Sequence, residues 1–408
     1  MGWLRRFVRT TPGVVGLIAV VVAAACVLAG VVIGGQLDGR ISESRSVLDR
    51  SEPFAYSAQK LYAALSAADA AAATEYLSGG LETAAMRARY QQALADAAEA
   101  LTDATVGATD GDTRAALAQI SADLAAYTGQ VESARANNRQ GFAVGAAYFR
   151  EASSLMQTSM LPSAERIYAG GLAAVDEHQG AVSALPIVGL VLLVVVLVVI
   201  AVGSLILVGR TNRQFNRGLL AAAIVVVLVI AWIVVANGFA ARSIEQSRTE
   251  GTAKFEKLAD ARVLAQKART DETLELISRG DVTAGEKAFN DHVGELAAKL
   301  DDGPVAAVDA LRAWTASHRK QVELYQGGDY PAAVAQAIGN DPTASSAQFT
   351  AVEASLSDAI EKTRATLRDD VSAAGGRLAW SPTGALVLMV IAAAAAVVGL
   401  WPRLKEFL

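Results

Sequence analysis

The sequence LPIVGLVLLVVVLVVIAVGSLILV, at residues 185–208, contains no Asp, Glu, Lys, Arg or His. At a rise of about 1.5 Å per residue, a helix of this length crosses about 30 Å of hydrocarbon. The basic stretch RTNRQFNR follows at 210–217, and a second apolar run, LLAAAIVVVLVIAWIVV, covers 219–235. The sequence therefore predicts two membrane-spanning helices joined by a short basic connector.

Two further uncharged runs, at 14–33 and 384–400, bring the number of predicted spans to four. The composition agrees, because 53% of the 408 residues are hydrophobic and 19% are charged, whereas soluble domains are about 45–50% apolar and about 25% charged. The first run follows three arginines and also fits a cleaved signal peptide or a lipoprotein signal ending at Cys26. We favour an uncleaved span, because the apolar run continues past Cys26 to Ile33.

The charges between the spans orient the chain. The three short segments carry eight basic residues and one acidic residue, whereas the two long segments carry more acidic than basic residues. Basic residues are enriched in cytoplasmic loops, so both termini are predicted to be cytoplasmic. The predicted order is a cytoplasmic N-terminus (1–13), transmembrane helix 1 (14–35), an extracytoplasmic bundle (36–183), transmembrane helix 2 (184–209), a cytoplasmic connector (210–217), transmembrane helix 3 (218–238), a second extracytoplasmic bundle (239–380), transmembrane helix 4 (381–402) and a cytoplasmic tail (403–408).

Both long segments are rich in residues that favour helices. A face of apolar residues at helical spacing marks the first helix of the first segment: Phe54, Ala58, Leu61, Leu65, Ala68, Ala72 and Tyr76. Turn-forming residues are expected to break the helices at 78–80, 107–112, 137–141, 279–281, 301–304, 327–329 and 340–342. The predicted fold class is an all-α membrane protein with four transmembrane helices and two extracytoplasmic four-helix bundles, whose outer helices continue into the spans.

The two halves of the chain resemble each other. The similar pairs are ISESR (41–45) with IEQSR (244–248), LSGG (77–80) with ISRG (277–280), and QVE after Tyr127 (130–132) with QVE after His318 (321–323). Each pair is short, but their order is preserved. We interpret the chain as a duplicated unit of span, bundle and span, which resembles the external half of a bacterial chemoreceptor or sensor kinase.

The residue inventory excludes several function classes. One cysteine and three histidines give no disulfide framework, no multi-cysteine zinc site and little material for catalysis. The sequence therefore predicts no enzyme, no cofactor and no metal site. A net charge of −5 argues against nucleic acid, and spans without ionisable residues argue against a transporter. A signal-transmitting role and a structural or envelope-assembly role remain open.

Two local motifs have ordinary structural interpretations. Asp110-Gly111-Asp112 lacks the glutamate of a calcium loop and is expected to cap a helix. Thr283 and Glu286 fit a capping box at a helix start.

The histidines and two aspartates are harder to assign. His292 and His318 have no ligand pair nearby in the sequence, so solvated or core positions are expected. Asp69 and Asp271 fall at similar places in the repeat, where either a solvated face or a polar site between helices is possible.

A closer resemblance covers nearly the whole chain. Residues 61–69 (LYAALSAAD), 76–80 (YLSGG), 266–274 (QKARTDETL), 277–281 (ISRGD) and 9–13 (RTTPG) are similar to actinobacterial GlnX-type membrane proteins. This resemblance implies a relay across the plasma membrane. In that relay an extracytoplasmic amino-acid-binding lipoprotein (GlnH-like) reports to the membrane protein, which controls a cytosolic serine/threonine kinase (PknG-like).

Two groups of residues are candidate contacts. Arg262, Arg269 and Asp271 cluster beside the repeat position, and arginine binds carboxylates well, so they are candidates for a ligand or an external partner. Inside the cell, the connector is the preferred target for a partner, because it links the first unit to the second and carries the apolar Phe215 among polar neighbours. Its candidate contacts are Arg210, Arg213, Phe215 and Arg217.

Overall fold

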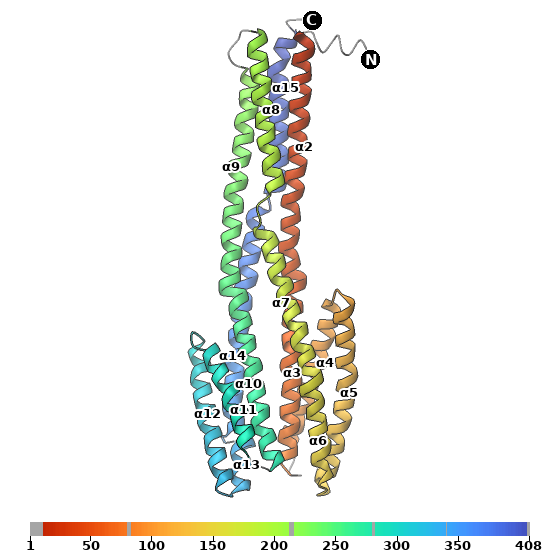
Figure 1. The fold of residues 1–408 in the computed structure, drawn as a ribbon, viewed down its shortest axis with the longest axis vertical. Helices are drawn as coiled ribbons and strands as arrows, with labels where there is room; N and C mark the ends of the chain where they lie inside the picture. The colour runs from red at the N-terminus through yellow and green to blue at the C-terminus, as the bar shows by residue number, and fades with distance from the viewer. Residues whose placement is uncertain (1–10, 80–82, 212–215, 280–281, 340, 406–408) are drawn as a thin grey trace. The chain divides into compact units, whose positions relative to one another are not determined.

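The computed structural model describes residues 11–79, 83–211, 216–279, 282–339 and 341–405. Helices make up 92% of the structure, and the described residues contain no strand (Figure 1). The predicted all-α class is therefore confirmed. The described chain forms two compact units: a membrane unit, from residues 1–47, 177–246 and 369–408, and a bundle unit, from residues 48–176 and 247–368.

The membrane unit contains four long helices, one for each predicted span. They are α2 (Thr11–Ser46), α8 (Ile187–Thr211), α9 (Arg217–Gln246) and α15 (Ser381–Lys405). Each has an apolar stretch long enough to cross a membrane. Large apolar side chains such as Val20, Ile187 and Leu205 are exposed on the surface of this unit, as expected for residues that face lipid. The prediction of a multi-pass membrane protein is confirmed.

Helices α9 and α15 approach each other closely at Gly218 and Gly399. A Cβ atom on Gly218 would lie 2.4 Å from the Cα of Gly399, so this crossing requires glycine. The Asn216 side chain fixes the same contact. Its Nδ2 donates to the Gly399 carbonyl (3.0 Å), while its Oδ1 accepts from the Gly218 amide at the start of α9 (2.9 Å).

The helical backbone continues from the spans into the bundle unit. It runs unbroken from Gly13 to Leu77 and from Arg217 to Ser278, passing through the short π-helices η1 (Val47–Ser51) and η3 (Ser247–Thr252). Both stretches exceed the length that hydrocarbon requires, about 20 residues, so only their apolar parts are spans. The remainder forms the first helix of each half of the bundle unit.

The predicted orientation can be measured by cysteine labelling. In a Cys26→Ala background, Ser133→Cys and Ser355→Cys are expected to react with a membrane-impermeant maleimide in intact cells, because both belong to segments predicted to be extracytoplasmic. Lys405→Cys in the predicted tail is the matched control, and it should react only after the cells are permeabilised. Protection of Ser133→Cys or Ser355→Cys in intact cells would overturn the orientation.

The first half of the bundle unit has four helical segments. They are α3 (Glu52–Leu77), α4 (Ala84–Gly107), α5 (Gly111–Arg139), and a last segment of α6 (Val144–Leu155), η2 (Met156–Met160) and α7 (Leu161–Ser183). All three predicted breaks are confirmed, and Asp110 caps α5 by accepting the Thr113 amide (2.7 Å). On the predicted face of α3, the five residues between Phe54 and Tyr76 are buried and these two end residues are half-buried.

The second half contains α10 (Ala253–Ser278), α11 (Thr283–Lys299), α12 (Val305–Gln326), α13 (Tyr330–Ile338) and α14 (Ser345–Leu378). The expected breaks fall between these helices, including the interruption near 340–342. The predicted capping box is wrong. Helix α11 begins at Thr283 with Val282 as its N-cap residue and no side-chain cap, because the Glu286 carboxylate turns instead to His318.

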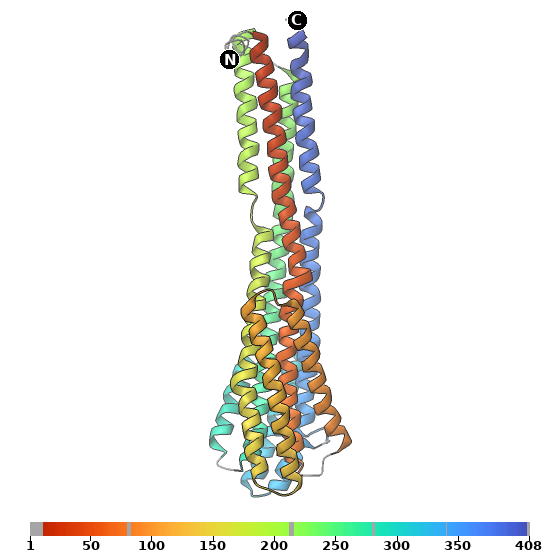
Figure 2. The same ribbon diagram turned by 90° about the vertical axis from the view of Figure 1, so that its right-hand side faces the viewer.

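Both halves pack into the one bundle unit, where α3 contacts α10 (Figures 1 and 2). Charged side chains connect the halves. Arg262 of α10 donates to Gln59 of α3 (3.3 Å), and Glu52 of α3 pairs with Arg364 and Arg368 of α14. The two halves therefore share an interface that is rich in polar contacts.

Candidate functional site: a buried charge network around Glu272

Glu272, on α10, is the centre of a buried polar network in the second half. Its side chain is 0% exposed and forms an ion pair with Arg269, one helical turn earlier. Its carboxylate also accepts hydrogen bonds from Trp314 Nε1 (3.2 Å) and from Ser345 Oγ, and it lies 3.1 Å from His318 Nδ1. A buried carboxylate is tolerated only when it is paired in this way.

Arg269 is fixed from several sides. Its Nη2 donates to the Ala337 carbonyl at the end of α13 (3.3 Å), and its Nη1 reaches Ser345 Oγ (3.5 Å). The guanidinium lies over the Phe349 ring, 5.7 Å from the centroid. The Arg269–Glu272 pair therefore contacts both sides of the break between α13 and α14.

His318 joins the network to α11. Its Nε2 lies 3.0 Å from Glu286 Oε2, and its ring stacks on Phe289 with 3.6 Å between the centroids. The Trp314 ring packs edge-on against Phe289 (5.4 Å). Aromatic rings thus enclose the polar atoms, which strengthens their electrostatic interactions by excluding water.

Burial and charge act in opposite directions on these groups. Burial alone would raise the pKa of Glu272, but the Arg269 charge and the His318 contact outweigh burial and lower it to about 2. Burial alone would lower the pKa of His318, whereas the hydrogen bonds and charges of Glu272 and Glu286 raise it. The network therefore favours the charged form of both groups.

Helical spacing explains why these residues meet. Arg269 and Glu272 are three residues apart on α10, and Trp314 and His318 are four apart on α12. Residues at these spacings share one helix face. Ser345 and Phe349 share a face in the same way at the start of α14. The network therefore forms where one face each of α10, α12 and α14 meet.

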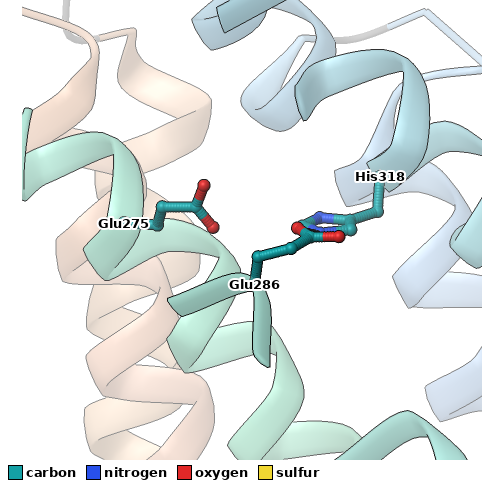
Figure 3. A group of neighbouring side chains, drawn as sticks. All are labelled: Glu275, Glu286 and His318. Carbon is teal, nitrogen blue, oxygen red and sulfur yellow. Dashed lines mark hydrogen bonds and ion pairs between the residues drawn. The ribbon is translucent and has the colours of Figure 1, made fainter. Parts of the chain in front are cut away.

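A third carboxylate faces the same histidine. Glu275, one turn after Glu272, has ligand atoms within 4.8 Å of those of Glu286 and His318, and Figure 3 shows both carboxylates pointing toward the His318 ring. Burial raises the pKa of Glu275 to about 7. Among the described residues, this is the group of His, Cys, Asp and Glu side chains with the geometry for a metal ion.

The first half has a smaller buried site around Asp69 of α3. The Asp69 carboxylate accepts hydrogen bonds from Ser153 Oγ (2.9 Å), Gln157 Nε2 (3.1 Å) and the Tyr127 hydroxyl (3.2 Å). Burial raises its pKa, although these bonds oppose that effect. Of the two interpretations of Asp69, the polar site between helices is therefore correct.

Asp69 predicts a pH dependence of stability. Its pKa is higher in the folded than in the unfolded protein, so its contribution to the free energy of unfolding is largest below the unfolded value, about 3.9, and is lost as the pH rises through the folded value. Since Asn does not titrate, the melting temperature of the wild type minus that of Asp69→Asn should fall between pH 4 and pH 8, a range chosen to begin near that unfolded pKa. Thermal melts of the full-length protein in detergent measure this difference. Asp96→Asn, at an exposed position of α4, should instead follow the wild type, and parallel profiles for Asp69→Asn would contradict the prediction.

The predicted external residues separate into three places. Arg269 belongs to the Glu272 network. Arg262 lies two turns earlier and pairs with Glu353 (2.5 Å). Asp271 turns to α11, where its Oδ2 lies 2.7 Å from His292 Nδ1. The structure therefore does not gather Arg262, Arg269 and Asp271 around one ligand position.

The predicted connector is described only at its ends. Arg210 lies in α8, and Arg217 is the exposed first residue of α9. Arg213 and Phe215 lie outside the described residues.

Sequence reasoning missed Glu272, Glu275 and Glu286 as site residues, and it treated His318 as isolated. His318 and Glu272 are 46 positions apart, so no local pattern joins them. One signal was available. His318 and Trp314 share one helix face, and Arg269 and Glu272 share another. Each of these faces carries polar groups that need hydrogen-bond partners, and the other face in the same bundle could supply them.

Residues 43–180 match the model of a family described as an actinobacterial sensor domain. The match covers about a third of the chain and includes Asp69 and its partners, while the Glu272 network lies beyond it. No curated protein and no solved structure matches the chain. Together with four helices apolar enough to cross a membrane, the match indicates a multi-pass membrane protein of the actinobacterial sensor type.

Proposed function

We propose that the protein relays a signal across the plasma membrane from an extracytoplasmic amino-acid-binding lipoprotein to a cytosolic serine/threonine kinase. The chain would act as a GlnX-type protein between GlnH-like and PknG-like partners, with lipid around its spans. It would be a transducer and not an enzyme, and it would need no cofactor for the relay. Both termini and the connector would be cytoplasmic, with the bundle unit outside.

One observation supports this proposal above the others. Asp69 and Glu272, the acids at the centres of the two buried sites, lie on helices that continue without a break into apolar spans. A rearrangement around either acid would displace or rotate its helix, and that motion would be transmitted along the helix. Shifts of about 1–2 Å in packed helices are an established way of switching proteins.

The relay requires two packings of the bundle unit that differ by a few kcal/mol, with the external partner favouring one of them. Buried polar networks suit such a switch, because a partly broken network is costly and the alternatives are therefore discrete. The repeated order of apolar helix, π-helix and polar helix in α2–η1–α3 and α9–η3–α10 supports a duplicated unit in which each half carries one input helix.

The proposal is tested by deleting the gene in its native host and adding amino acids outside the cell. Phosphorylation of the kinase's substrates should lose its response to the amino acids, and wild-type complementation should restore it. Pull-down of the full-length protein from membranes should also capture the lipoprotein and the kinase. A deletion strain with normal signalling but a damaged envelope would favour the alternative, a structural or envelope-assembly protein. Solute flux in vesicles containing the pure protein would favour transport.

A further inference from the structure

The cluster of Glu275, Glu286 and His318 has a property that the proposed relay does not use. Glu275 is 9% exposed, and its Oε2 atom is buried without a hydrogen-bond partner. An unpaired buried carboxylate oxygen is costly, and such groups usually have a partner. The carboxylate points toward His318 and Glu286 (Figure 3), so the missing partner belongs between these side chains.

The charges around Glu275 show what kind of partner is missing. Three carboxylates gather here, Glu272, Glu275 and Glu286, and Arg269 pairs with the first of them. With a doubly charged ion bound at a neutral His318, the ion and Arg269 together balance the three carboxylates.

We propose that Glu275, Glu286 and His318 bind one divalent transition-metal ion of the zinc class. One nitrogen and two carboxylate oxygens are a ligand set that Zn²⁺ accepts, and three protein ligands leave a fourth position for water or an incoming ligand. The hard cations Ca²⁺ and Mg²⁺ prefer oxygen ligands alone, so a site that contains imidazole favours the zinc class over them.

The geometry fits this ion. The ligand atoms lie within 4.8 Å of one another. In a tetrahedral zinc site with bonds of about 2.1 Å, ligand atoms are about 3.4 Å apart, so modest rotations of the side chains close the site. The Glu286 side chain is 32% exposed, which gives an ion a route from solvent. Glycine at position 285 leaves the space that Glu275 needs, since a Cβ there would lie 3.3 Å from its Oε2.

Glu272 has the position of an outer-shell residue. It faces Nδ1 of His318, while Nε2 faces Glu286. A metal-binding histidine commonly donates its other N–H to a carboxylate, which fixes the ring and makes it a better ligand. The buried network thus positions His318 with Nε2 directed toward the metal.

The test uses the full-length protein in detergent, purified on a tag without histidine and stripped of metal with a chelator. Titration with ZnCl₂ in a calorimeter should give one saturable site per chain. Glu275→Gln should weaken binding by at least about 10-fold, because Glu275 is a direct ligand and loss of an outer-shell partner alone typically costs about 10- to 100-fold. X-ray absorption at the zinc edge should show nitrogen and oxygen ligands without sulfur.

His292→Gln is the matched control, because His292 pairs with Asp271 and is not a member of the metal-competent group found among the described residues. This variant should bind zinc like the wild type. His318→Gln should abolish binding, but its buried side chain makes the fold sensitive. Glu275→Gln is therefore the decisive variant, because it keeps the shape of the side chain and replaces the carboxylate ligand by an amide. No saturable site in the wild type, unchanged affinity in Glu275→Gln, or sulfur in the coordination shell would each overturn the proposal. None of these results depends on the relay.

Discussion

Glu272→Ala is expected to destabilise the bundle unit by about 3–5 kcal/mol, the cost of leaving a buried charge without its partner. The variant leaves the Arg269 guanidinium buried, and it removes the acceptor shared by Trp314, His318 and Ser345. Urea unfolding of the full-length protein in detergent measures the loss. Trp314 fluorescence reports the site when Trp3, Trp232, Trp380 and Trp401 are replaced by Phe, because Trp314 is then the one tryptophan in the chain.

A double variant separates the charge from the packing. Arg269→Met with Glu272→Leu removes both charges, and Trp314 keeps Ser345 as its acceptor (2.9 Å). Replacing a buried pair by apolar side chains is often neutral, so the double variant should recover part of the stability lost in Glu272→Ala, while His318 Nδ1 still lacks its Glu272 partner. Asp291→Ala breaks an exposed pair with Lys287 and should leave the unfolding curve unchanged. If Glu272→Ala behaves like Asp291→Ala, the network does not stabilise the fold.

Much of the fold could be predicted because its determinants are local. A span is an uncharged run, and a helix end is a glycine or a cap, as at Asp110. These signals need no knowledge of distant residues. Glu286 shows the limit of such reasoning. Its spacing from Thr283 fits a capping box, but its carboxylate contacts His318 instead. The competing partner lies 32 residues away.

The partners of the candidate site residues could not be predicted, because helical periodicity does not specify contacts between distant helices. Arg269 was a candidate because arginine binds carboxylates, and its partner proved to be Glu272 on its own helix. Arg262 and Asp271 lie on the same helix, but they point to α14 and α11 respectively. A helix surrounded by neighbours presents different partners around its circumference, so closeness in sequence did not imply a shared site.

The connector is where the proposed signal would leave the membrane. Helix α8 ends at Thr211 and α9 begins at Arg217, so few residues separate the two halves of the chain here. Asn216 binds both the start of α9 and the Gly399 carbonyl of α15. A shift of α9 against α15 therefore displaces the end of the connector, where the proposed cytosolic partner would detect it.

Arg213→Ala with Phe215→Ala is expected to reduce the kinase response to external amino acids by at least about tenfold, within the usual range of coupling between sites. Arg210 and Arg217 remain next to the spans, so insertion and orientation should be normal. Phosphorylation of kinase substrates measures the response, and cysteine labelling verifies the orientation.

Thr211→Ala with Gln214→Ala is the matched control, because it changes two uncharged polar residues in the same short segment and should preserve the response.

The competing explanation is that the arginines fix orientation and contact anionic lipid, without contacting a protein. Under that explanation the double variant of Arg213 and Phe215 would respond normally. The cytosolic partner would then contact the termini, or the signal would pass through contacts within the membrane. Phe215 makes the two explanations separable: Arg213→Ala alone weakens a lipid contact, whereas an aromatic anchor for a protein partner would be lost only with Phe215→Ala. A response that survives Arg213→Ala and fails in Phe215→Ala would therefore identify a protein partner at the connector.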